Sequence, residues 1–129
     1  MSCRIHTLAE RRRVKANASV DGKMTDSKLL DFVELLGTLK HVERTGWVKM
    51  NVAKPETISG HMYRMASMCF LLDDNSNLNR NKRIESCLVH DMAECIVGDI
   101  TPFCGVPVEE KHRQEVEAME KLSEMAGPG

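Results

Sequence analysis

Aromatic residues are scarce in this sequence: it contains one Trp, one Tyr and three Phe among 129 residues. A β-sandwich with an aromatic-rich core is therefore disfavoured, and the core must be filled mainly by Leu, Val, Ile and the nine Met. Met suits irregular gaps between helices because its side chain is unbranched and flexible. The composition, 42% hydrophobic and 29% charged, is that of a globular protein. These features favour a single domain of packed helices.

Cysteine pairs of the C-x-x-C type are also absent, and the five Cys are odd in number. This pattern argues against a disulfide framework or a zinc knuckle and favours reduced thiols inside the cell. We expect a cytoplasmic protein. The Arg-rich start leaves a mitochondrial transit peptide as an alternative, although Glu10 and Asp21 fit one poorly. No apolar run approaches the roughly 20 residues of a membrane span, so we expect no membrane partner.

Charge is unevenly distributed along the chain. Residues 1–28 carry seven basic and three acidic side chains, whereas the remainder carries eleven basic and sixteen acidic ones. We expect residues 1–26 to be a disordered basic segment and residues 27–129 to form the domain. A mildly acidic domain has no broad positive field, so we expect no nucleic-acid polymer as a partner.

Apolar residues recur with the period of an amphipathic helix in four stretches of the sequence. The pattern predicts helices over residues 27–39, 57–72, 80–97 and 108–125, with loops at 45–55, 73–77 and 99–105. On the second helix, the residues predicted to face inward are His61, Met65, Met68, Cys69 and Leu72. The last helix has a thin apolar seam, formed by Val116, Met119 and Leu122.

Three residues of the third helix carry the chemistry that can be inferred from the sequence. His90 and Asp91 are adjacent, and Glu94 follows within one helical turn, so all three border one helical surface. Imidazole and carboxylate together suit Mn, Co, Fe, Zn or Mg ions. Taken alone, a His-Asp pair is more often structural, but charges in apolar surroundings need partners or a metal. His61 lies on the preceding helix. Taken alone, it is better explained as an interior histidine, but the presence of the His90–Asp91 pair favours it as a third ligand.

Two longer segments, Ser59 to Ala66 (SGHMYRMA) and His90 to Ile100 (HDMAECIVGDI), resemble the HD domain-containing protein 2 family of 5'-deoxynucleotidases. Arg44 to Val48 and Glu110 to Arg113 are similar to it too. The resemblance implies an all-α fold, the HD-domain helical bundle, which is usually a homodimer. It also implies hydrolysis of deoxynucleoside 5'-monophosphates to deoxynucleoside and phosphate with a divalent metal ion, for which we expect Mn, Co or Mg.

The resemblance further implies roles for individual residues. They are metal ligands (His61, His90 and Asp91), a catalytic residue that activates water (Glu94) and substrate contacts (Arg44, Trp47 and Asp99). An Arg can bind phosphate through two parallel hydrogen bonds, and a bulky indole can exclude a ribose 2'-hydroxyl. Without the resemblance, Trp47 is equally explained by core packing and Arg44 by a solvated loop charge.

The sequence departs from the family in two respects. Gly60 stands where relatives have an acidic residue, and the family's fourth metal ligand, an Asp on a later helix, has no counterpart here. We therefore expect an incomplete HD domain whose later helices are missing, with an apolar patch beside the metal residues and weak activity. The alternative is a catalytically weak or inactive module that binds nucleotide or dimerises.

Overall fold

The computed structural model describes residues 26–73 and 75–127, and these residues are almost entirely helical or in loops. The α-helices are α1 (Asp26–Gly37), α2 (Thr45–Lys49), α3 (Ile58–Met68), α4 (Arg80–Val89), α5 (Glu94–Val97) and α6 (Val108–Ala126). Short 3₁₀ turns are η2 (Thr38–Lys40), η3 (Cys69–Leu71) and η4 (Pro102–Cys104). The all-α prediction is confirmed. The predicted disordered segment 1–26 lies, apart from Asp26, outside the described residues.

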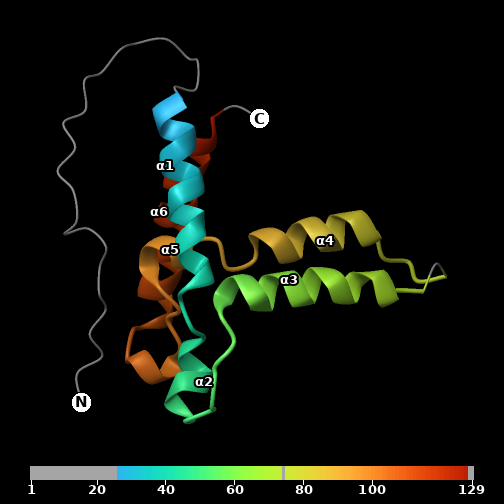
Figure 1. The fold of residues 1–129 in the computed structure, drawn as a ribbon, viewed down its shortest axis with the longest axis horizontal. Coiled ribbons are helices and arrows are strands. Elements are labelled where there is room, and N and C mark those ends of the chain that lie inside the picture. The colour runs from blue at the N-terminus through green and yellow to red at the C-terminus, as the bar shows by residue number, and fades with distance from the viewer. Residues whose placement is uncertain (1–25, 74, 128–129) are drawn as a thin grey trace.

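The helices form a body and a projecting hairpin (Figure 1). In the body, α1 and α6 lie side by side with α5 against them, whereas α3 and α4 extend away from it as an antiparallel pair. The buried core joins the two parts, and its members are Leu39, Ile58, Met62, Cys95 and Leu122. The predicted ligands His61, His90 and Asp91 lie where the hairpin meets the body, near the start of α3 and just after the end of α4.

Helix α3 begins where the sequence predicts. The Thr57 side chain caps it, since its Oγ1 accepts a hydrogen bond from the Gly60 backbone N–H at 3.2 Å. The predicted inward face is wrong in part, because Ile58, Met62 and Ala66 are the buried residues and Met68 is 58% exposed. Only the start of α3 reaches the core, and its far end projects with the hairpin (Figure 1).

Removing this cap should destabilise the fold measurably. We expect Thr57→Ala to lower the free energy of unfolding by about 1 kcal/mol, because the Gly60 N–H loses its partner. Thr57→Ser keeps the hydroxyl and serves as the matched control. Thermal melting of both variants checks the prediction, and equal melting temperatures for alanine and serine would show that the cap contributes nothing.

The predicted helix over 80–97 is interrupted between Val89 and Glu94, where two of the predicted metal ligands lie. Helix α4 ends at Val89, four residues follow in a turn, and α5 resumes at Glu94. The turn allows Asp91, Ala93, Glu94 and Cys95 to be buried together, which one face of a continuous helix does not permit. The Asp91 N–H points to the Met62 Sδ at 3.4 Å, so packing against α3 holds the break.

The segment predicted as a loop at 45–55 contains α2. Its start is stabilised from a distance, because the Asp99 Oδ2 accepts a hydrogen bond from the Thr45 backbone N–H at 2.7 Å. Asp99 lies 54 residues later in the chain and takes the place of a local cap. This contact also fixes α2 beside the loop that carries Asp99.

Helix α6 follows its predicted range closely, but some of its apolar residues are buried and others are partly exposed. Ala118 and Leu122 are buried, whereas Val116 and Met119 are 41% and 37% exposed. Val116 and Met119 line a cavity that also borders His90 and Asp91. Among the described residues, no helix is long and apolar enough to cross a membrane.

Candidate metal-binding site

Three side chains from two parts of the chain converge at the root of the hairpin. His61 lies on α3, and His90 and Asp91 lie in the turn after α4. One ligand atom from each lies within 4.8 Å of the others. The His90 Nε2 is 3.3 Å from the Asp91 Oδ1, and the His61 Nε2 is 3.8 Å from the Asp91 Oδ2. The structure thus brings the three predicted ligands together in a group that could hold a metal ion.

A carboxylate lies on the far side of His61 from Asp91. The His61 Nδ1 is 3.9 Å from the Glu56 Oε2, which accepts a hydrogen bond from Arg64 at 2.6 Å. The other ring nitrogen of His61, Nε2, faces Asp91.

Glu94 is buried beside this group. Glu94 is only 5% exposed, and its Oε2 has no hydrogen-bond partner in the part of the chain that the structure describes. Burial, followed by the nearby charges of Asp91 and Asp99, raises the pKa of Glu94 to about 8. Arg44 and Lys111 oppose this rise only in part, so negative charge still exceeds positive charge around Glu94. Two imidazoles and a carboxylate beside an unpartnered acid therefore fit a divalent cation.

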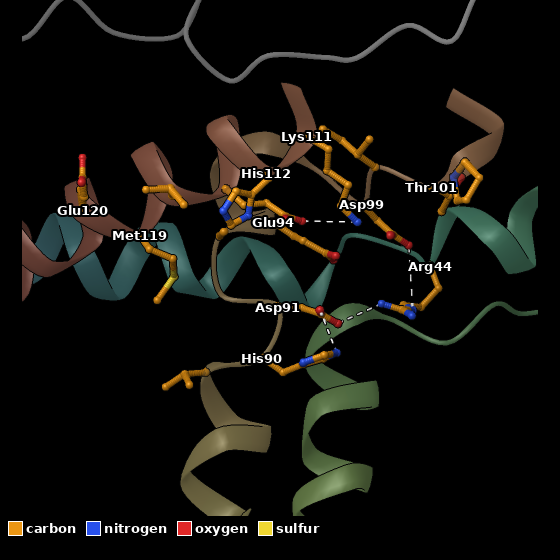
Figure 2. Close-up of a pocket in the computed structure, with 16 residues that line it drawn as sticks. Arg44, His90, Asp91, Glu94, Asp99, Thr101, Lys111, His112, Met119 and Glu120 are labelled. Carbon is orange, nitrogen blue, oxygen red and sulfur yellow. Dashed lines mark hydrogen bonds and ion pairs between the residues drawn. The ribbon is translucent and has the colours of Figure 1, made fainter. Parts of the chain in front are cut away.

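Arg44 is held between two carboxylates at the edge of the site (Figure 2). Its Nη1 is 2.9 Å from the Asp91 Oδ2, and its Nε is 3.9 Å from the Asp99 Oδ2. Because a guanidinium carries five N–H donors, this pairing leaves donors free for an anionic ligand. The Arg44 side chain is 26% exposed, so a ligand can reach it.

A cavity of about 680 Å³, a volume suited to a small molecule, is bordered by five of the seven predicted residues: Arg44, His90, Asp91, Glu94 and Asp99. His61 and Trp47 do not line it. Figure 2 shows the Glu94 carboxyl group pointing into it from one side and side chains of α6 facing it from the other. The α6 wall consists of Lys111, His112, Glu115, Val116, Met119 and Glu120. Val116 and Met119 were expected in the apolar seam of the last helix, but none of the six was predicted to line the site. The available signal was the i,i+4 spacing of Lys111 and Glu115, which form an ion pair at 3.4 Å.

A smaller hollow of about 340 Å³ adjoins the cavity and shares Arg44, Asp99 and Thr101 with it. Its apolar lining is Trp47, Met50 and Phe103. Trp47 is 47% exposed, so core packing does not account for it. Met50 and Phe103 were missed from the sequence, where an aromatic residue within a turn-rich loop was the only hint.

Comparison with known proteins gives concordant matches. The HD domain family profile matches residues 36–129. The chain is 57% identical over 97 residues to "5'-deoxynucleotidase HDDC2" of Bos taurus and 54% identical over 97 residues to that of Homo sapiens. It is 45% identical over 100 residues to "5'-deoxynucleotidase hdd1" of Schizosaccharomyces pombe. These alignments cover 75%, 75% and 78% of this chain but 47%, 47% and 50% of the relatives. The chain therefore spans about half the length of the curated relatives it matches.

Proposed function

This chain belongs to the HD domain family, and from that membership we propose that it hydrolyses deoxyribonucleoside 5'-monophosphates to deoxyribonucleoside and phosphate. The relatives named 5'-deoxynucleotidase support the reaction class. The observation that carries the proposal is the convergence of His61, His90 and Asp91 beside the buried Glu94. Metal-dependent phosphate release from dAMP, with AMP as the comparison substrate, tests it.

In this proposal His61, His90 and Asp91 hold one divalent ion, with Mn, Co or Mg as the candidates. When bound, such an ion supplies positive charge that stabilises negative charge on the phosphate and makes water more acidic. The two His side chains are neutral donors and Asp91 a charged one, so the cation would also offset the carboxylates gathered around Glu94.

Glu94 is proposed as the proton carrier. Its Oε2 is unpartnered and its carboxyl group points into the cavity (Figure 2), so its ionised form, which dominates above the raised pKa of about 8, can accept a proton from an attacking water. The same carboxylic acid can then return the proton to the leaving 5'-oxygen of the deoxyribose. Burial excludes competing solvent hydrogen bonds, which favours transfer between Glu94 and the reacting atoms.

Arg44 and Asp99 are proposed to hold opposite ends of the sugar phosphate. Arg44 faces the cavity and would donate hydrogen bonds to phosphate oxygens, while Asp99 would accept one from a sugar hydroxyl. Trp47 lines the adjoining hollow, where its indole would exclude a ribose 2'-hydroxyl. Asp99 has a second task, because it also caps α2 and thereby fixes Trp47 and Arg44 relative to the cavity.

The apolar hollow is proposed to receive the base, because it adjoins the phosphate-facing Arg44 and presents Trp47 and Phe103. We expect Phe103→Ala to weaken binding of dAMP about tenfold, since stacking of a base on an aromatic ring contributes about 1–3 kcal/mol. Trp47 is the one Trp of the sequence, so its fluorescence reports binding directly. Deoxyribose 5-phosphate, which has no base, should bind equally to both forms.

Phe70 is the matched control for this experiment. It is 69% exposed, similar to the 64% of Phe103, but it lies in η3 at the far end of the hairpin. Phe70→Ala should leave the dAMP titration unchanged. If the Phe103→Ala variant binds dAMP as tightly as the parent chain, the base does not bind in this hollow.

We also propose that the protein forms a homodimer, as expected from the family. Large apolar side chains are exposed along the hairpin, and a second copy would cover them; three of them are Tyr63, Phe70 and Leu71, which are 72%, 69% and 84% exposed. Sedimentation equilibrium measures the mass directly. Leu71→Asp should shift the equilibrium toward monomer, whereas a monomeric parent chain at all concentrations would refute the dimer.

A further inference from the structure

Two thiols on neighbouring helices face each other within the hairpin. The Sγ atoms of Cys69 in η3 and Cys87 in α4 are 3.8 Å apart, although the residues are separated by 18 positions in the sequence. Both residues are half-buried, and Cys69 also donates to the Met65 carbonyl oxygen at 3.5 Å. The pair lies outside both hollows of the candidate site.

We propose that Cys69 and Cys87 are a covalent modification site, at which a small-molecule disulfide such as oxidised glutathione converts the two thiols into an intramolecular disulfide. A disulfide places its sulfur atoms about 2.05 Å apart, so the pair must close by less than 2 Å, roughly the change that side-chain rotation provides. The contact between η3 and α4 already places these two thiols next to each other.

The other described cysteines are less suited to the reaction. Cys95 is only 3% exposed within the core, and the Cys104 Sγ lies 3.6 Å from the Thr101 Oγ1. A thiol must be reached by the oxidant and then by a second thiol. Partial exposure and a facing thiol are combined at Cys69 and Cys87.

The exchange proceeds in two balanced steps. One thiolate attacks a sulfur of oxidised glutathione, forms a mixed disulfide and releases one glutathione thiolate, which takes up the proton. The second protein thiol then loses its proton and attacks the protein sulfur of the mixed disulfide. A second glutathione leaves and is protonated. Two protein thiols are oxidised and one glutathione disulfide is reduced to two thiols.

The crosslink would tie together the two helices that present the candidate metal ligands. Cys69 follows His61 on the same arm of the hairpin, and Cys87 precedes His90 by less than one helical turn. Closing a loop within the chain restricts the unfolded state. Oxidation should therefore raise the melting temperature by about 5 °C or more.

Alkylation and mass spectrometry test the proposal on the full chain. The reduced protein should take up five alkyl groups, one for each Cys. After equilibration with oxidised glutathione it should take up two fewer, remain monomeric on a non-reducing gel and show a peptide pair linked through Cys69 and Cys87. A reductant should restore all five.

Single replacements separate this pair from the other thiols. Cys69→Ala and Cys87→Ala should each abolish the internal crosslink and leave a glutathione adduct on the remaining partner, whereas Cys104→Ala should crosslink like the parent chain. Peptide mapping of the parent chain decides the matter even if a variant fails to fold. A chain that keeps all its thiols, or links a different pair, would overturn the proposal.

Discussion

His90→Ala is expected to lower the affinity for Mn²⁺ or Co²⁺ by about 100-fold or more. Loss of an outer partner of a metal ligand commonly costs about 10–100-fold, and loss of the ligand itself should cost at least as much. The His90 side chain is 55% exposed, so its removal should have little effect on the stability of the fold. A calorimetric titration of the parent chain and the variant with Mn²⁺ measures the difference.

His112→Ala is the matched control for this titration. His112 lines the same cavity from α6 but lies outside the group formed by His61, His90 and Asp91. The control should bind Mn²⁺ like the parent chain. If His90→Ala and His112→Ala reduce the affinity equally, the ion is not held by the predicted ligands.

Glu94→Gln should lower the turnover number for dAMP by about 10²–10⁴-fold, because the amide cannot accept a proton from water. The amide keeps nearly the same shape, so metal and nucleotide binding should persist. The release of inorganic phosphate at saturating dAMP measures turnover, and Trp47 fluorescence measures binding in the same samples.

Glu115→Gln provides the comparison for Glu94→Gln. Glu115 also borders the cavity, but it forms an ion pair with Lys111 on α6. It does not belong to the group of His61, His90 and Asp91. Its replacement should change turnover by far less. Equal turnover in Glu94→Gln and the parent chain would remove Glu94 from the proposed proton transfer.

The long helices could be predicted from the sequence because their signals are local. The periodic apolar residues and the Thr57 cap place α3, and the same reasoning places α1 and α6. His61 was inferred as a third ligand from its imidazole and the His90–Asp91 pair, and the family resemblance supported this set, since spacing along the chain does not say which side of α3 faces the turn.

The remaining features depend on contacts between distant segments. The interruption after Val89 is held by packing of Met62 against Asp91, and α2 is capped by Asp99. Neither contact leaves a local pattern in the sequence. For the same reason, the α6 wall of the cavity and the facing thiols of Cys69 and Cys87 became visible only in three dimensions.

Our central proposal is that this chain carries a metal-dependent site for deoxynucleotide hydrolysis. Its most direct test is phosphate release from dAMP and from AMP by the purified chain, each with Mn²⁺, Co²⁺ or Mg²⁺ and with a chelator. We predict release that requires a metal ion, is faster from dAMP than from AMP and disappears in His90→Ala. A chain that binds the metal and dAMP but releases no phosphate under any of these conditions would contradict the hydrolase assignment and favour a nucleotide-binding module.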